Sequence, residues 1–151
     1  MTEVSLRKAT VEDLTFVAAC AEIAYQIYVD RIGKKPAPMV ADFAAALRAQ
    51  QLEILVVDDQ PIGFLVSYEK AQCLFVENVA IAPEHQGKGY GGAIFDALER
   101  RASVGGLAAI ELYTNEKMSE NLKFYSRLGF TEFDRRSESG FNRIYFRKEL
   151  G

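Results

Sequence analysis

The chain has 151 residues, of which 49% are hydrophobic and 26% charged, a composition typical of one soluble globular domain with a real core. Its net charge of −3 disfavours a polyanionic partner such as nucleic acid, and no stretch approaches the roughly 20 apolar residues of a membrane span. One histidine and two distant cysteines leave little material for a metal site or a Ser-His-Asp triad. We expect a single cytoplasmic domain over residues 1–151, without metal, in which Cys20 and Cys73 are buried or half-buried thiols.

The N-terminal part of the chain is expected to be mainly helical after a short strand at residues 4–8. Thr10 and Asp13 resemble a capping box ahead of apolar residues at helical spacing, which predicts a helix over 11–28. A basic loop with two prolines follows at 30–38. It leads into a second predicted helix at 39–50, with a proline near its start.

The middle of the chain reads as a meander of three strands. Apolar runs at 53–58 and 62–69 flank the sequence Asp58-Asp59-Gln60-Pro61, which favours a turn. A third strand at 74–82 follows closely enough to extend this hairpin.

A helix is predicted next, over residues 89–103, ending at Gly105-Gly106. The strand at 108–113 follows that helix, so we expect it to lie parallel to the 74–82 strand through a right-handed crossover. The predicted buried face of the helix consists of Ile94, Phe95, Leu98 and Ala102.

A short helix at 119–127, ended by Gly129, and two strands at 130–136 and 141–148 complete the chain. The expected fold class is therefore mixed α/β (α+β): a mostly antiparallel sheet of about six to seven strands, flanked by about four helices.

The most informative feature is the glycine-rich turn between the 74–82 strand and the 89–103 helix. Four glycines, Gly87, Gly89, Gly91 and Gly92, lie within six positions. They leave little side-chain bulk over the first helical turn, where unpaired N–H groups and the helix dipole favour an anion. The pattern predicts a phosphate site. A tight helix start without a ligand is the alternative, although one glycine would suffice for that.

The same glycines also fit the dinucleotide fingerprint Gly-x-Gly-x-x-Gly, and Glu111 lies near where a ribose-binding acid is expected. In that fold, however, the first glycine comes straight after the strand, whereas residues 83–86 intervene here. Only two strands are expected to be parallel, too few for a doubly wound sheet. Both observations argue against a dinucleotide.

Two segments resemble the signatures of the GCN5-related N-acetyltransferase (GNAT) superfamily. The sequence Gln86-Gly87-Lys88-Gly89-Tyr90-Gly91 is similar to its Gln/Arg-x-x-Gly-x-Gly/Ala pattern, and Phe124-Tyr125-Ser126-Arg127-Leu128-Gly129-Phe130 to its Tyr-x-x-x-Gly-Phe pattern. The order of elements matches over nearly the whole chain. The resemblance implies an acyl-CoA-dependent N-acyltransferase that moves the acetyl group of acetyl-CoA to a primary amine of a small molecule or peptide, directly and in a ternary complex.

The resemblance also implies which residues hold acetyl-CoA. The N–H groups of residues 87–92 would bind the pyrophosphate, and the backbone of residues 79–81 would pair with the pantetheine arm like an added strand. Many relatives have an asparagine seven residues before the tyrosine, where it bonds the pantetheine; this chain has Met118 at that position. Asn115 or Asn121 could take the place of that asparagine. Helix capping or solvation is an equal alternative for both. The predicted acetyl-CoA residues are Val79, Ala80, Ile81, Gln86, Gly87, Lys88, Gly89, Tyr90, Gly91, Gly92, Asn115 and Asn121.

Tyr125 and Glu77 are the predicted catalytic residues. Tyr125 matches the family tyrosine that protonates the CoA sulfur; an aromatic ring that only packs on the sheet is the alternative. Glu77 precedes the pantetheine-binding stretch on the same strand and is the first candidate for the base. It could instead be solvated or ion-paired, because a bulge near Asn78 would change the face it occupies. Glu111 is the second candidate, and the base stays open because the family's usual glutamate position aligns with Tyr113.

The acceptor is expected to meet Tyr25, Tyr28 and Arg31, although a basic loop that is merely solvated is the alternative. No nucleic acid or membrane partner is expected, and a homodimer is suggested weakly by the aromatic residues of the last strand, Phe141, Tyr145 and Phe146. The alternative function is a non-catalytic acyl-CoA-binding regulatory module on the same fold.

Overall fold

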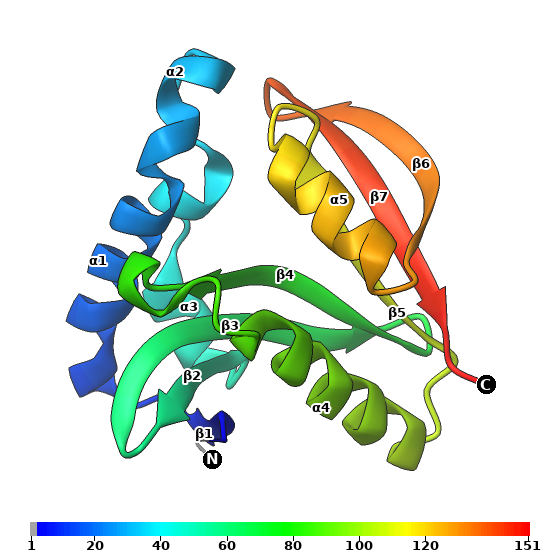
Figure 1. Cartoon of the computed structure of the whole chain (residues 1–151), viewed down its shortest axis with the longest axis horizontal. Coiled ribbons are helices and arrows are strands. Elements are labelled where there is room, and N and C mark those ends of the chain that lie inside the picture. Colours follow the sequence, from blue (N-terminus) through cyan, green and yellow to red (C-terminus); the bar gives the residue numbers. More distant parts are fainter. Residues whose placement is uncertain (1–2) are drawn as a thin grey trace. The chain divides into compact units, whose positions relative to one another are not determined.

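The computed structural model of the chain describes residues 3–151, apart from the side chain of Val40 (Figure 1). Seven strands follow one another in the sheet order β1-β2-β3-β4-β5-β7-β6. The β4–β5 pair is parallel, whereas the β1–β2, β2–β3, β5–β7 and β6–β7 pairs are antiparallel. Four of the described α-helices, α1, α3, α4 and α5, have six residues or more. The predicted fold class is confirmed.

The chain divides into two compact units. The N-terminal unit comprises the described residues up to Ser67 together with Asn78–Asp96, and the C-terminal unit comprises Tyr68–Glu77 and Ala97–Gly151. Three elements contribute residues to both units: β3 (Gln60–Lys70), β4 (Cys73–Ile81) and α4 (Tyr90–Val104). That the whole chain is one domain stays a prediction.

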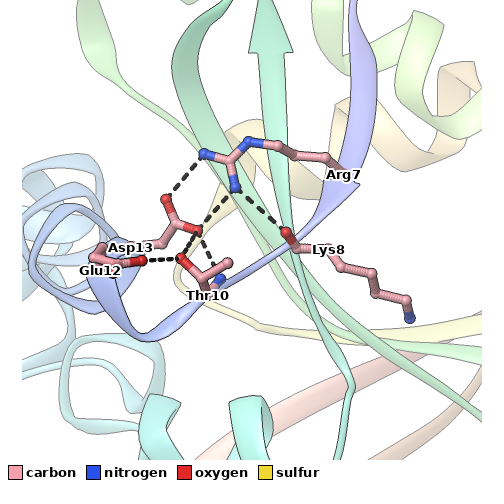
Figure 2. A network of polar contacts seen from close by, with 5 residues as sticks. All are labelled: Arg7, Lys8, Thr10, Glu12 and Asp13. Atoms are coloured by element: carbon pink, nitrogen blue, oxygen red, sulfur yellow. Dashed lines mark hydrogen bonds and ion pairs between the residues drawn. The ribbon is translucent and has the colours of Figure 1, made fainter.

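The N-terminal unit begins with β1 (Ser5–Lys8) and α1 (Leu14–Tyr25), which are joined by a polar network. The Arg7 guanidinium donates two hydrogen bonds, of 2.8 and 2.9 Å, to the Asp13 carboxylate (Figure 2). The same carboxylate accepts the backbone N–H of Thr10 at 2.8 Å, one half of the predicted capping box. These bonds fix the angle at which the chain leaves β1 for the first helix.

The first helical segment is longer and less regular than predicted. After α1, a 3-10 turn at Gln26–Tyr28 leads into α2 (Val29–Ile32), which ends at Gly33 with φ of 84°. The prediction of a loop from residue 30 was therefore wrong by three residues, because the left-handed glycine that stops the helix stands at position 33.

The prediction of a helix over 39–50 was also wrong. A 3-10 turn occupies Ala37–Val40, and α3 runs only over Phe43–Arg48. Two features separate these pieces: Ala41 is extended, with ψ of 150°, and the Asp42 side chain accepts the N–H of Ala45 at 3.0 Å. An aspartate cap thus starts the helix, where apolar spacing alone suggested an earlier start.

The predicted hairpin is confirmed. Strand β2 (Leu52–Val57) pairs with β3 around Asp58 and Asp59, which both adopt positive φ (50° and 62°). Helix α3 packs on this hairpin: the ring of Phe43 meets that of Phe64 edge-on at 5.1 Å. In Figure 1, α3 lies beside α1, which it also contacts.

The C-terminal unit contains β5 (Ala109–Asn115), α5 (Ser119–Arg127), β6 (Thr131–Glu138) and β7 (Phe141–Glu149). The parallel pairing predicted for the crossover is present, with residues 73–76 of β4 facing 109–112 of β5. Helix α5 lies along β7 (Figure 1), where the Tyr125 ring is 6.0 Å from Phe146.

The buried face predicted for α4 is confirmed, since each of its four apolar residues is at most 2% exposed. The helix ends at Val104 and is followed by Gly106 in a left-handed conformation, with φ of 77°. Cys20 and Cys73 are buried free thiols, as predicted. Within residues 3–151, no helix combines the length and the apolar character that crossing a membrane requires.

Candidate functional site

The glycine-rich turn joins β4 to α4 in the N-terminal unit. Gly87 and Gly89 have φ of 76° and 84°, a region that only glycine occupies without strain. A Cβ atom added to either of them, or to Gly92, would meet no atom within 4 Å. The turn is therefore bordered by open space that side chains do not fill.

The N-terminal turn of helix α4 presents backbone N–H donors next to the glycine-rich turn. The first hydrogen bond within the helix runs from the N–H of Ala93 to the carbonyl of Gly89, at 3.2 Å. Helix geometry therefore leaves the N–H groups of Tyr90, Gly91 and Gly92 without intrahelical acceptors. Together with the dipole of this 15-residue helix, they suit a phosphate group.

Strand β4 has alternating burial from Val76 to Ile81, with even positions buried and odd positions half-buried. Val79 and Ile81, two positions apart, consequently share one face of the strand. The face that Glu77 occupies stays a prediction.

The edge of β4 that faces away from β3 carries the backbone carbonyls of Val79 and Ile81. On the β3 side, the N–H of Ala82 donates to the carbonyl of Ile62 at 2.8 Å. Residues at odd positions direct both backbone groups to the opposite side. There the hydroxyl of Tyr25 donates to the carbonyl of Val79 at 2.8 Å, and the side-chain amide of Gln86 to that of Ile81 at 2.9 Å.

This edge belongs to the stretch for which an added strand was predicted. The parallel register with β5 covers β4 residues Cys73–Val76, so the pairing ends before the predicted pantetheine residues begin. Tyr25, which the sequence placed on the acceptor side, contacts the same stretch through Val79. The N-terminal unit thus brings together the glycine turn, residues 79–81, Gln86 and Tyr25.

Glu77 lies in the C-terminal unit, half-buried, next to a tyrosine that the sequence did not single out. The pKa of Tyr68 is raised to about 12, first by burial and then by the nearby charge of Glu77. The Tyr68 ring packs on Phe75 at 5.5 Å. A hairpin register that places residue 68 opposite residue 75 would have revealed this neighbour.

Tyr113 occupies the position where the family often has a glutamate. Its ring lies between Phe75, at 5.9 Å, and Tyr145, at 5.4 Å, with the guanidinium of Arg143 4.3 Å from its centre. Burial is the main cause that raises the pKa of Tyr113, and the charge of Glu77 acts in the same direction. The aromatic ring is therefore packed between two other rings and a guanidinium in the C-terminal unit.

Glu111, the second candidate for the base, is engaged in an ion pair. Its carboxylate accepts a 2.6 Å hydrogen bond from Arg147, which also bonds Glu149 at 2.6 Å and the sulfur of Cys73 at 3.3 Å. The Glu111 carboxylate therefore already has a cationic partner. That Glu77 is the first candidate for the base stays a prediction. Among the described residues, no group of three or more His, Cys, Asp and Glu side chains is placed to hold a metal ion.

Tyr125 is buried in an aromatic cluster on α5. Its ring centre is 5.8 Å from Phe130 and 6.0 Å from Phe146, and it is 7% exposed. These contacts fix the ring and agree with both interpretations of the residue, as a packing aromatic and as a positioned acid. Tyr145 and Phe146, named as a weak indication of a homodimer, are buried as well.

The two asparagines near Met118 differ in their partners. Asn115 accepts the N–H of Lys117 at 2.9 Å in a local turn. Asn121 donates to the hydroxyl of Thr114 at 3.3 Å and to the sulfur of the buried Met118 at 3.5 Å. Neither contact tests a role in binding pantetheine, so both assignments stay predictions.

Comparison with known proteins gives a consistent result. Residues 50–132, more than half of the 151-residue chain, match the family described as acetyltransferase (GNAT) domain. Many solved structures have a similar fold. The ribosomal-protein-S18-alanine N-acetyltransferase from Escherichia coli shares 16% identity, with 97% of this chain and 94% of that chain covered and a TM-score of 0.75.

Two further structures are similar to the same extent. The PaiA N-acetyltransferase from Thermoplasma acidophilum, solved with coenzyme A, shares 17% identity over 95% of this chain and 98% of that chain, with a TM-score of 0.77. A GCN5-related N-acetyltransferase from Rhodopseudomonas palustris shares 22% identity over 98% of this chain and 96% of that chain, with a TM-score of 0.78. Identities this low concern the fold, not the substrate.

Proposed function

The chain belongs to the acetyltransferase (GNAT) family, as its two motifs indicated, and on this basis we propose that it is an acetyl-CoA-dependent N-acetyltransferase. The acceptor is a primary amine of a small molecule or peptide, and the acetyl group passes to it directly within a ternary complex. The observation that carries the proposal is the junction of β4 and α4, where an outward-facing strand edge runs into a glycine turn bordered by open space.

This junction suits the two chemically different parts of CoA. The N–H groups of Tyr90, Gly91 and Gly92 provide donors for the pyrophosphate, and the exposed ammonium of Lys88 adds positive charge. The edge of β4 offers backbone carbonyls at Val79 and Ile81 to an extended arm that carries amides. In the family, one relative of similar fold has been solved with coenzyme A, which supports this assignment.

The reaction requires a proton acceptor and a proton donor. We assign Glu77 as the base, which takes a proton from the acceptor ammonium directly or through water. The neutral nitrogen then attacks the thioester carbonyl carbon, and the C–S bond breaks as the tetrahedral intermediate collapses. The nitrogen, positively charged after the attack, loses its second proton to solvent. Tyr125 gives its phenolic proton to the departing thiolate, and the proton held by Glu77 restores the phenol by way of solvent, so that one proton is released for each acetyl group transferred.

The acceptor side is assigned to Tyr25, Tyr28 and Arg31 of the N-terminal unit. The guanidinium of Arg31 lies 5.2 Å from the ring centre of Tyr28, which is 6.4 Å from that of Tyr25. The Tyr28 ring orients this cation, and we assign an anionic group on the acceptor as its ligand. The name of one relative of similar fold specifies an alanine of a ribosomal protein as its acceptor, so a peptide amine is among the candidates.

A screen for CoA release tests the proposal. The protein is incubated with acetyl-CoA and with polyamines, amino acids, aminoglycosides or amine-ended peptides, and free thiol is measured. Stimulation of release by at least one class, above hydrolysis without acceptor, is expected. Tight binding of acetyl-CoA without stimulation by any acceptor would favour the regulatory module instead.

A further inference from the structure

Two side chains already occupy the acceptors on the outward edge of β4. They come from different elements: Tyr25 from the end of α1, and Gln86 from the segment that leads into the glycine turn. The Tyr25 hydroxyl donates to the carbonyl of Val79 at 2.8 Å, and the Gln86 side-chain amide donates to the carbonyl of Ile81 at 2.9 Å. The two acceptors are thus two residues apart on the strand. The edge is therefore paired by side chains where a further strand would otherwise pair with it.

We propose that Tyr25 and Gln86 stand in for the amides of pantetheine in the free protein, and that acetyl-CoA displaces at least Tyr25 when it binds. This inference rests on the function proposed above. The two carbonyls are about 7 Å apart, since each residue of a strand rises by about 3.4 Å. An extended arm with amide N–H donors pairs with acceptors at that repeat, as an added strand does.

The burial of Tyr25 makes its contact the more consequential of the two. Tyr25 is 9% exposed, whereas Gln86 is exposed to solvent, where water can replace the amide of its side chain. The Tyr25 hydroxyl is therefore the donor that water replaces less readily. Removing this hydroxyl leaves the carbonyl of Val79 short of a donor until a ligand supplies one.

Tyr25, whose hydroxyl acetyl-CoA displaces, is also one of the residues assigned to binding the acceptor. The ring of Tyr25 is 6.4 Å from that of Tyr28, over which Arg31 is stacked. Tyr25 is thus a positioning residue that links the strand edge to the acceptor residues, and release from Val79 is what makes its hydroxyl available to them.

Calorimetric titration with two ligands tests the inference. CoA carries the pantetheine arm, and 3′-phosphoadenosine 5′-diphosphate contains the nucleotide and pyrophosphate without it. We expect Tyr25→Phe to bind CoA about three- to tenfold more tightly than the unmodified protein, and to bind the nucleotide equally well. The matched control is Tyr145→Phe, which removes a tyrosine hydroxyl bonded to Glu138 in the C-terminal unit and should change neither affinity.

The outcomes separate the inference from the proposed function. Unchanged or weaker CoA binding by Tyr25→Phe, with normal nucleotide binding, would overturn the inference and leave the acetyltransferase proposal standing. Failure of the unmodified protein to bind CoA would overturn both. Should Tyr25→Phe fail to fold, Gln86→Leu at an exposed position provides the second variant, and a ratio of CoA to nucleotide affinity that does not rise would contradict displacement at Ile81.

Discussion

Gly63 on β3 lies against the backbone of Ala80 on β4, so closely that a Cβ atom at position 63 would be 2.2 Å from the Ala80 carbonyl oxygen. Real Cβ atoms do not approach backbone oxygens to this distance. Gly63 does not adopt a positive φ, so the requirement for glycine comes from this approach and not from the turn. It holds the middle of the predicted pantetheine-binding stretch against its neighbouring strand.

Gly63→Ala is expected to lower the free energy of unfolding by about 1–3 kcal/mol, because the added methyl must push back the backbone of Ala80. It should also weaken CoA binding, since the displaced residues form the strand edge. Urea unfolding and calorimetric titration measure the two effects. Gly105→Ala is the control, because its Cβ would make only ordinary contacts, the shortest at 3.4 Å. Equal stability of the two variants would show that the approach at Gly63 relaxes without cost.

Asp13 ties the first helix to β1 in a manner that depends on pH. The hydrogen bonds from Arg7 are the main cause that lowers the pKa of Asp13 to about 2, against the opposing effect of burial. A depressed pKa stabilises the folded state above the ordinary value of 3.8, and this contribution is lost as the pH falls from about 4 to about 2.

Asp13→Asn should therefore lower the free energy of unfolding at pH 7 by about 1–2 kcal/mol and change it little near pH 2. Thermal unfolding over this pH range measures the difference. The exposed neighbour Glu12, which accepts the hydroxyl of Thr10 at 2.8 Å (Figure 2), provides the control as Glu12→Gln. A destabilisation by Asp13→Asn that is the same at both pH values would contradict the role of the charge.

Tyr125→Phe tests the proposed acid. Because the ring contacts with Phe130 and Phe146 do not involve the hydroxyl, the variant should fold and bind CoA normally. Its turnover should fall about 100-fold or more, the usual contribution of a positioned acid. Steady-state kinetics with an accepted amine measure this loss. Tyr145→Phe is the comparison, and unchanged turnover in Tyr125→Phe would leave only the packing interpretation.

Glu77→Gln and Glu111→Gln distinguish the two candidates for the base. Glu77→Gln should reduce turnover about 100-fold while preserving CoA binding, and should flatten the acidic limb of the pH–rate profile. Glu111→Gln should instead lower stability by about 1 kcal/mol, since Arg147 loses a 2.6 Å partner, and should leave that limb in place. The reverse pattern would reassign the base to β5.

The sequence predicted the elements whose pattern is local. The apolar spacing of α4, the paired aspartates before β3 and the glycine after α5 each specify a structure through neighbouring residues, and each was found. The helix predicted over 39–50 was wrong because the Asp42 side chain caps the N-terminus of a shorter helix that begins at Phe43. Apolar spacing does not reveal a break that one side chain makes with the backbone.

In the candidate site too, features set by neighbouring residues could be predicted from the sequence, and features set by distant residues could not. A glycine turn is recognised from sequence because its function depends on the backbone and on missing side chains. The partners of Tyr25 and Glu111 could not be predicted, since Tyr25 bonds a residue 54 positions away and Glu111 one 36 positions away. Tyr68 beside Glu77 is intermediate, because a correct hairpin register would have placed it there.

Mass spectrometry of enzyme and acceptor after one incubation with acetyl-CoA tests the central claim most directly. An amine that stimulates CoA release is incubated with the protein and acetyl-CoA, and the masses of the protein and of the acceptor are then measured. Direct transfer predicts that the acceptor gains one acetyl group on its amine and that the mass of the protein stays unchanged. An acetylated protein, or an acceptor whose mass stays unchanged while CoA is released, would contradict the account.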